Sequence, residues 1–399
     1  MHPSYDITIV GAGVIGLTQA VALTAAGFKV ALVDAQAKPV LSLPETFDVR
    51  VFALNRFSQR CLKKWGIWSH IESLRFAAYH QVALSFQQNH PELIFRDSDD
   101  AEPNLGYIVE QSVWREAALE QLAHHPYCDF FWQYAVQSIE QTDTGAVVSC
   151  AKTANNETLS IETKLVIGAD GAHSTVRALS AMHVESYACQ QTAVIFNIQV
   201  AQTHHFFAAQ YFLPQGIIAF LPLADSHCFS IVWSMPDEVW QQNDLDDAAL
   251  AALLNDLIAH KWGALSIISK RFSFPLAQAQ AKQYVMKKTI LIGDAAHTIH
   301  PLAGQGANLG IADIDALMTQ LMIAKASARP IFDPQLLRKY ARARRSAAGQ
   351  MMGFMAVFSL CAGQTSLFNY ALSQGSRLIN RLIFLKNLLT RFALYQFTK

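Results

Sequence analysis

The chain has little cysteine, and none of it is arranged as a metal-binding or redox motif. Six cysteines stand far apart along 399 residues, and neither a C-x-x-C pair nor a Cys/His cluster with zinc spacing occurs. This spacing argues against a metal site and against a disulfide framework. It is typical of a protein of the reducing cytosol, so we expect no metal ligands and a cytoplasmic location.

Net charge and long apolar runs are also lacking. The 31 Lys and Arg balance the 31 Asp and Glu, so the chain lacks the positive charge that would hold a nucleic acid. No uninterrupted apolar stretch is long enough for a membrane-spanning helix. The apolar N-terminal segment is broken by glycines and follows no basic leader, which argues against a signal peptide. With 52% hydrophobic residues, the chain can fill a large core, and its length predicts two or three domain-sized units.

Acidic residues are absent from the end of the chain. From Pro334 to Lys399 there are ten Lys and Arg but no Asp or Glu, which leaves 21 basic and all 31 acidic residues in the first 333 positions. The neutral chain thus divides into a body with a formal charge of −10 and a tail with +10. On a helix Arg377, Arg381 and Arg391 would fall within about 80° of one another. Either they are the solvated face of a packed helix, or they contact anionic lipid or a partner that carries a lipid-soluble substrate.

The N-terminal segment has the pattern of a βαβ unit that binds a dinucleotide. A strand-like run, ITIV (7–10), leads directly into GAGVIG (11–16). A helical run, LTQAVALTAAG (17–27), follows, and then a second strand, KVALVDA (29–35), which contains Asp34. This is a G-x-G-x-x-G turn with an acid about twenty residues further on.

Each part of this motif has a physical reason. Gly11 makes the tight turn, Gly13 lets backbone approach a pyrophosphate, and Gly16 allows close packing of helix and strand. The helix start offers free N–H groups to phosphate, and Asp34 can accept hydrogen bonds from a ribose. The motif alone does not separate NAD from FAD, and the alternative interpretation is an ordinary packing turn.

A second glycine site lies near the middle of the chain. TKLVIGADGAHSTVR (163–177) begins as a strand and breaks at Asp170 and Gly171, with Arg177 six residues further on. Turn residues cluster in any loop. This segment by itself therefore predicts only a strand followed by a turn.

A third glycine site follows in KKTILIGDAAHTIHPLAGQGANLGIADIDALM (287–318). An apolar strand-like run stops at Gly293 and Asp294, and three glycines precede or open the next helix: Gly304, Gly306 and Gly310. Taken alone, Asp294 could be a solvated acid in a surface turn. The spacing of these glycines is not that of a second dinucleotide motif.

Together, in this order, the three segments resemble the flavoprotein aromatic hydroxylases along essentially the whole chain. Three further stretches resemble the ubiquinone-biosynthesis branch of that family: DVRVFALNRFSQRCLKKWGIW (48–68), GYIVEQSVWREAALEQL (106–122) and YARARRSAAGQMMGFMAVF (340–358). The resemblance implies an FAD-dependent monooxygenase that hydroxylates a (poly)prenylated phenol with O2 and NAD(P)H through a flavin C4a-hydroperoxide. The resemblance also implies that NADPH or NADH binds only transiently, and the absence of a second G-x-G-x-x-G motif agrees with this.

Other functions on the same scaffold stay open. A prenyl reductase, a small-phenol hydroxylase and a non-catalytic FAD-binding assembly factor would share the cofactor motifs. A flavin halogenase is disfavoured because its W-x-W-x-I-P motif is absent; VWSMPDEVW (232–240) does not match it.

The resemblance also implies the residues that hold FAD. By this resemblance, Asp294 contacts a ribityl hydroxyl of FAD and Pro301 lies beside the isoalloxazine ring. The start of the following helix faces the pyrimidine edge of that ring. A helix N-terminus there would stabilise the negative charge of reduced flavin. The predicted cofactor residues are Gly11, Gly13, Gly16, Asp34, Arg50, Gln111, Asp170, Gly293, Asp294, Pro301, Gly304, Gln305, Gly306, Ala307 and Asn308. No catalytic residue is assigned, and His297 and His300 are left without a role.

The expected fold class is α/β, with a Rossmann-like FAD-binding domain, an inserted, mostly antiparallel substrate domain and a C-terminal helical extension. The FAD-binding domain is predicted from 1–73, 110–182 and 285–330, the substrate domain from 74–109 and 183–284, and the helical region from 331–399. In the substrate domain GIIAFLPL (216–223) is expected to be a strand that lines the cavity. Three aromatic residues nearby fit core packing better than cavity lining: Tyr211, Phe212 and Phe220.

The expected partners follow from the same resemblance. They are an apolar prenylated phenol and O2, and no nucleic acid. The basic C-terminal region is expected to make a peripheral contact with the inner face of the membrane or with a ubiquinone-biosynthesis complex.

Overall fold

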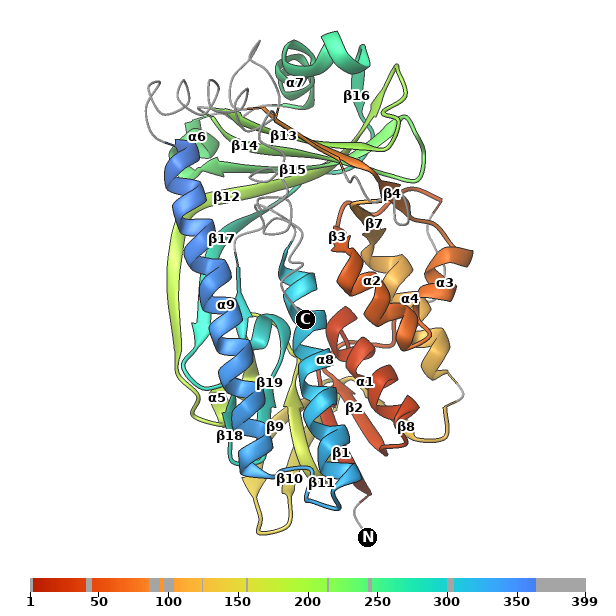
Figure 1. Ribbon diagram of the computed structural model, residues 1–399, viewed down its shortest axis with the longest axis vertical. Coiled ribbons are helices and arrows are strands. Elements are labelled where there is room, and N and C mark those ends of the chain that lie inside the picture. The colour runs from red at the N-terminus through yellow and green to blue at the C-terminus, as the bar shows by residue number, and fades with distance from the viewer. Residues whose placement is uncertain are drawn as a thin grey trace.

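The computed structural model describes residues 3–40, 45–85, 93–96, 104–123, 125–155, 157–213, 215–242, 246–299 and 305–363. Within these residues the strands form an eight-stranded, a nine-stranded and a three-stranded sheet. In Figure 1 the eight-stranded sheet and its helices make the lower part of the molecule, and the nine-stranded sheet lies across the top. The three-stranded sheet lies between them on one side.

The eight-stranded sheet has a parallel core, as the βαβ pattern predicts. The parallel strands lie in the order β19 (Thr289–Leu291), β11 (Thr158–Gly168), β1 (Ser4–Val10), β2 (Val30–Asp34) and β8 (Cys128–Trp132). Antiparallel additions are β18 (Val285–Met286), β9 (Tyr134–Gln141) and β10 (Ala146–Lys152). The apolar runs of β1 and β2 are buried on both faces, which is why they show no polar alternation.

Three helices pack around this parallel core. α1 (Val14–Ala25) contacts both α4 (Gln111–Leu122) and α8 (Gln305–Ala326). The residues of α1 from Gly16 to Thr24 are all buried, because the helix is covered by the sheet and by its two helical neighbours. The core cluster of this region therefore joins residues from the first, middle and last thirds of the chain.

The nine-stranded sheet is mostly antiparallel. Its strands run in the order β20 (His297–Thr298), β17 (Phe272–Ala281), β12 (Val184–Val200), β15 (Cys228–Pro236), β14 (Gly216–Pro222), β13 (Phe207–Leu213), β5 (Gln81–Ser85) and β6 (Leu93–Arg96), and β16 (Leu265–Ile267) also pairs with β12. Among the described strands of this sheet, only β13 and β5 pair in parallel. α6 (Asp237–Gln242) and α7 (Asp247–Trp262) lie on one side, where residues such as Phe220, Phe229 and Leu254 form a second core.

The three-stranded sheet connects the other two layers. It contains β3 (Val51–Asn55), β7 (Gly106–Glu110) and β4 (Ala77–Tyr79). α2 (Arg56–Lys64) and α3 (Trp68–Ser73) follow β3, and Asn55 caps α2 by accepting a hydrogen bond from the Ser58 N–H. Two short elements follow strands of the eight-stranded sheet. α5 (Thr175–Leu179) comes after β11, and a 3₁₀ turn, η1 (Gly293–Ala295), comes after β19.

The predicted domain divisions do not follow the sheets at every point. β20 lies in the segment predicted for the FAD-binding domain, yet it pairs with β17 of the nine-stranded sheet. β7 spans the predicted division at position 110 and pairs with both β3 and β4.

The three aromatic residues that the sequence placed near the cavity are buried. Tyr211 and Phe220 belong to the core beside α7, and Phe212 packs on the opposite face of the sheet.

The C-terminal region begins with one long helix. α9 (Pro334–Gly363) packs along α8 and contacts β17 and β18. Positions 364–399, with Arg377, Arg381 and Arg391, lie outside the described residues. Of the helices that are described, none combines the length and the apolar character needed to span a membrane.

Candidate cofactor site

The first glycine turn is packed so closely that two of its glycines are required by space. Gly11 has φ +104°, and a Cβ there would lie 2.5 Å from the carbonyl oxygen of Ala169. A Cβ on Gly16 would collide with the carbonyl oxygen of Gly11. The end of β1 thus fits tightly between α1 and the end of β11.

Gly13 differs, because the space beside it is open. A Cβ on Gly13 would meet nothing within 4 Å. Gly13 is the N-cap of α1, and no side chain caps this helix start. Its first N–H groups therefore point to a surface that a phosphate can approach.

Asp34 closes the turn from the neighbouring strand. Its Oδ2 accepts a hydrogen bond from the Ala12 N–H at 2.6 Å, and its Oδ1 accepts one from the Gln36 N–H at 2.7 Å. The half-buried carboxylate therefore fixes the glycine turn. Each oxygen keeps a lone pair with which the predicted ribose contact could be made.

Asp170 and Arg177 stabilise the second glycine segment. Asp170 accepts hydrogen bonds from Ser174 Oγ at 2.5 Å and from the Val176 N–H at 3.1 Å, and Ser174 caps α5 by accepting from the Arg177 N–H. The Arg177 guanidinium donates to the carbonyl of Ala172 at 2.7 Å and to the carbonyl of Ala295 at 2.9 Å. Arg177 thereby ties the second segment to the third, a link that no local sequence rule indicates.

Asp294 lies in η1, where the third segment turns. Its side chain is accessible to solvent, yet enclosure by the surrounding protein raises the pKa of its carboxyl, against the opposing effect of His297 and Arg50. Both observations hold if protein surrounds the carboxylate on most sides and leaves one side open. A ligand hydroxyl on the open side would find an acceptor there.

Arg50 and Gln111 come together at the start of the three-stranded sheet. The Gln111 N–H donates to the Arg50 carbonyl at 3.1 Å. The Arg50 side chain is exposed and lies close enough to Asp294 to lower the pKa of its carboxyl. Glu110 accepts from the Asp48 N–H at 2.7 Å, so the segment that leads to Arg50 is fixed to β7.

The start of α8 faces the nine-stranded sheet (Figure 1). Asn308 is buried, and its side chain is fully used: Oδ1 accepts from the Asn55 N–H at 3.0 Å and from Ser58 Oγ at 2.6 Å, while Nδ2 donates to the Ala53 carbonyl at 2.8 Å. Any cofactor contact of Asn308 would therefore use its backbone N–H.

Other predicted residues of this segment differ in what surrounds them. Gln305 and Ala307 are buried, and beside Gly306 a Cβ would meet only the Ile299 side chain, at 4.0 Å. Pro301 and Gly304 lie outside the described residues, as does His300.

The residues that the structure brings together fit FAD. Gly13 and Gly171 present bare backbone, with nothing within 4 Å of either Cβ position. The uncapped start of α1 suits a pyrophosphate, and Asp34 and Asp294 offer acceptors to hydroxyl groups. These groups lie at the carboxyl ends of β1, β2 and β19, where ligands bind to parallel sheets.

Sequence reasoning missed one buried acid beside this site. Asp313 of α8 is fully buried and contacts Gly293, His297 and Arg344. A signal was present, because Asp313 stands between Ala312 and Ile314 in an apolar part of the helical stretch that follows the third glycine segment. An acid at a core-facing helix position requires a buried partner, although the sequence does not say which one.

Comparisons with known proteins agree with the fold and with FAD as the cofactor. The family model described as FAD binding domain matches residues 4–355. The 3-demethoxyubiquinol 3-hydroxylase of Escherichia coli is 30% identical over 354 residues, which cover 87% of each chain. The mitochondrial ubiquinone biosynthesis monooxygenase COQ6 of Homo sapiens is 30% identical over 86% of this chain and 82% of its own. Among solved structures, p-nitrophenol 4-monooxygenase PnpA from Pseudomonas putida DLL-E4 has a TM-score of 0.78 at 17% identity and covers 99% of each chain.

The fold and the site thus define a flavoprotein with one FAD-binding domain and an attached antiparallel sheet. The chain belongs to the FAD-binding-domain family of flavoprotein aromatic hydroxylases. The predicted fold class, the FAD cofactor and the assignment as an FAD-dependent hydroxylase are confirmed. The individual cofactor contacts remain predictions.

Proposed function

We propose that this chain hydroxylates the aromatic ring of a (poly)prenylated phenol in ubiquinone biosynthesis, with O2 and a transiently bound NADPH or NADH. The names of relatives that are 30% identical, which are ubiquinone-biosynthesis hydroxylases, support the pathway. Bound FAD supplies the electron storage and oxygen activation that the reaction needs. The task of the protein is then to place an apolar ring beside the flavin and to exclude water.

The observation that carries this proposal is a row of accessible apolar side chains across the nine-stranded sheet. Ala219 pairs with Val232, Val232 with Ile195, and Ile195 with Phe272. Directly opposed residues of antiparallel strands point to the same face. Ala219, Val232 and Ile195 are partly accessible and Phe272 is 51% exposed. The row is therefore an apolar surface that is not fully covered by other side chains.

This row lies on the face that is directed towards the cofactor side. The alternate residues Phe220 and Ile231 point into the core beside α7. Cys228 is four residues from Val232 along β15 and therefore on the same face, and it belongs to the same hydrophobic cluster as Leu309 of α8. The apolar row is therefore on the α8 side of the sheet.

Hydrogen bonds connect the same face to the segment that carries Arg50. Nδ2 of Asn197 donates to the carbonyls of Phe47 and Asp48 at 3.0 and 3.2 Å. Ser230 Oγ donates to the carbonyl of Val49 at 3.3 Å. Because Arg50 follows directly and lies near Asp294, an apolar ring on this face would be held next to the proposed flavin position.

Measurement of substrate-stimulated NAD(P)H oxidation tests the proposal. The FAD-loaded protein should oxidise NADPH or NADH faster when a prenylated phenol is added, and the product should carry one additional hydroxyl group. A protein that binds FAD but shows no stimulation with any phenol would be the non-catalytic assembly factor. Equal stimulation by prenylated and unprenylated phenols would indicate a small-phenol hydroxylase.

We also propose that the basic C-terminal region makes a peripheral contact with anionic lipid or with a partner that carries the substrate. Arg344 does not add to the charge available for this contact, because it is buried and paired with Asp313. Near an anionic leaflet each basic residue that faces the surface contributes about 1 kcal/mol, so binding should be reversible and sensitive to salt. Changing Arg377, Arg381 and Arg391 to Gln should weaken co-sedimentation with anionic vesicles and leave FAD binding intact. If the unchanged protein ignores such vesicles and all partners at low salt, the contact does not exist.

A further inference from the structure

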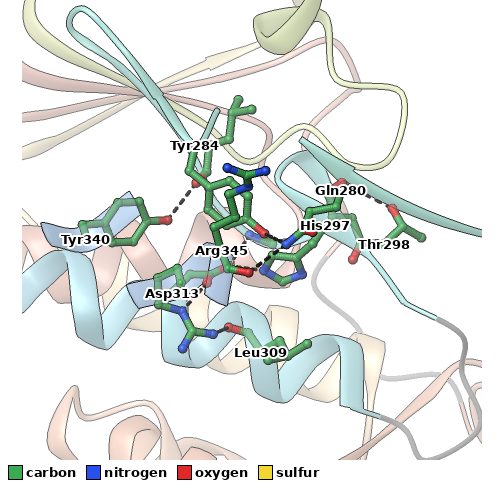
Figure 2. Close-up of polar contacts among 12 residues, drawn as sticks. Gln280, Tyr284, His297, Thr298, Leu309, Asp313, Tyr340 and Arg345 are labelled. Carbon is green, nitrogen blue, oxygen red and sulfur yellow. Dashed lines mark hydrogen bonds and ion pairs between the residues drawn. The ribbon is translucent and has the colours of Figure 1, made fainter. Parts of the chain in front are cut away.

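A buried group of charges lies directly behind the turn that carries Asp294. Its centre is Asp313 of α8, whose side chain is fully buried. Figure 2 shows contacts converging on this carboxylate from β20 and from neighbouring helices. Oδ2 accepts from the Gly293 N–H at 2.9 Å and lies 2.6 Å from Nε2 of His297, while Oδ1 accepts from Nε of Arg344 at 2.6 Å.

Arg344 brings the C-terminal helix into this group. It lies on α9, is buried, and donates a second hydrogen bond from Nη2 to the Leu309 carbonyl at 3.2 Å. Burial alone would raise the pKa of the Asp313 carboxyl, but His297 and Arg344 together hold it below its usual value. The carboxylate is thus ionised and compensated by a cation on a helix that begins twenty-one positions later in the chain.

His297 acts in this group as a hydrogen-bonding support. Its Nε2 is engaged with Asp313, and its Nδ1 is buried with no hydrogen-bond partner in the described part of the chain. The ring stacks on Tyr284, with centroids 5.9 Å apart and an interplanar angle of 29°. A proton shuttle needs a donor or acceptor on each side, and the described residues supply one on a single side only.

The Gly293 N–H is the link between this group and the cofactor side. Gly293 adopts φ +58° and directly precedes Asp294. Its N–H is buried and has the Asp313 carboxylate as its acceptor. Loss of that acceptor would leave a buried donor unsatisfied, and a rotation of the turn that relieves this would move Asp294.

We propose that Asp313 is a positioning residue that holds the Gly293–Asp294 turn in the conformation that receives FAD, and that Arg344 compensates its buried charge. The C-terminal helix in this way supports the Asp313 carboxylate from behind the proposed cofactor site. The inference rests on the proposed contact between Asp294 and FAD. It is independent of the identity of the phenol.

Two double variants that differ only at position 313 test the positioning role of Asp313. Both carry Arg344→Met, so that neither leaves an uncompensated charge in the core. Asp313→Asn keeps an oxygen that can accept from the Gly293 N–H, whereas Asp313→Leu has nearly the same shape without an acceptor. FAD affinity is measured by titrating the flavin-free proteins and following the quenching of flavin fluorescence, with circular dichroism as the check of folding.

We expect the Asn-containing protein to bind FAD within about threefold of the unchanged chain, and the Leu-containing protein to bind it at least tenfold more weakly, which corresponds to about 1.4 kcal/mol. Arg342→Met, an exposed arginine on the same helix, should change nothing. Equal dissociation constants for the two double variants would overturn the positioning role. Asp294→Ala in parallel separates the two claims: if that change leaves FAD affinity intact, the proposed FAD contact itself is wrong.

Discussion

Asp294 gives the sharpest prediction, because the structure assigns it opposite effects on cofactor binding and on stability. In the FAD-free protein its carboxylate is enclosed by protein, which raises its pKa. A carboxyl whose folded pKa lies above its unfolded pKa destabilises the fold at every pH where it is ionised in the unfolded chain. Replacing Asp294 by Asn should therefore raise the melting temperature of the FAD-free protein at pH 7.5. The gain should disappear as the pH falls below the ordinary carboxyl range, because the unfolded chain then also binds the proton.

FAD binding should respond in the opposite direction. A hydrogen bond to a charged acceptor contributes about 1.5–3 kcal/mol when it is formed away from water. Asp294 is accessible before the cofactor binds, and the loss of that hydration offsets part of the gain. We therefore expect Asp294→Ala to weaken FAD binding by about tenfold, with a smaller loss for Asp294→Asn.

The assay is a titration of flavin-free protein with FAD, followed by fluorescence quenching and paired with thermal melts of the same samples. Asp143→Ala, an exposed acid in the turn between β9 and β10, is the matched control and should change neither quantity. If Asp294→Ala binds FAD as tightly as the unchanged protein, the third glycine segment is only a surface turn. The reasoning about enclosure fails if Asp294→Asn lowers the melting temperature at pH 7.5.

The other predictions concern the glycine turn, a buried histidine and the apolar row. Gly13→Val places a side chain in the open space beside the start of α1 and should largely abolish FAD binding in a protein that still folds; full occupancy in a spectroscopic assay would refute the pyrophosphate position. Burial lowers the pKa of His204 to about 4 from 6.5, so the free energy of unfolding should fall by about 2–3 kcal/mol as the pH drops from 7 to 4. His204→Gln should remove that part of the pH dependence in denaturant titrations, and an unchanged slope would show that His204 is not its source. Ala219→Trp should fill the apolar row and reduce hydroxylation of the phenol while FAD binding is kept, so unchanged activity would contradict the proposed location of the ring.

Local rules explain why the glycine segments could be recognised in the sequence. Gly11 needs a positive φ, and Gly16 needs the absence of a Cβ, and both needs arise within one strand–turn–helix unit. Both glycines can therefore be predicted without information about residues that are far away in the sequence. The same holds for the strand character of 7–10 and 216–223, where apolar runs are bounded by glycine or other turn residues.

Other parts of the site depend on contacts that no local rule indicates. The side chain of Asn308 binds Asn55 and Ser58, about 250 positions earlier, so a residue predicted for the cofactor uses its amide to join α8 to β3 and α2. The partner of Asp313 on α9 is one of ten basic residues in a segment without acids. The pattern of charges in this segment does not indicate that Arg344 is buried. The predicted division near residue 110 likewise ignored the pairing of β7 with β3, because strand pairing over such distances is set by tertiary packing.

The central claim is that the bound flavin transfers oxygen to a prenylated aromatic ring. The most direct measurement is mass spectrometry of the product after the FAD-loaded protein has been incubated with NADPH or NADH, a prenylated phenol and ¹⁸O₂. We expect a ring-hydroxylated product that carries one ¹⁸O atom and forms only when O2, reductant and protein are all present. A product whose new oxygen comes from water, or FAD-loaded protein that leaves every prenylated phenol unchanged while it oxidises NAD(P)H, would contradict the claim.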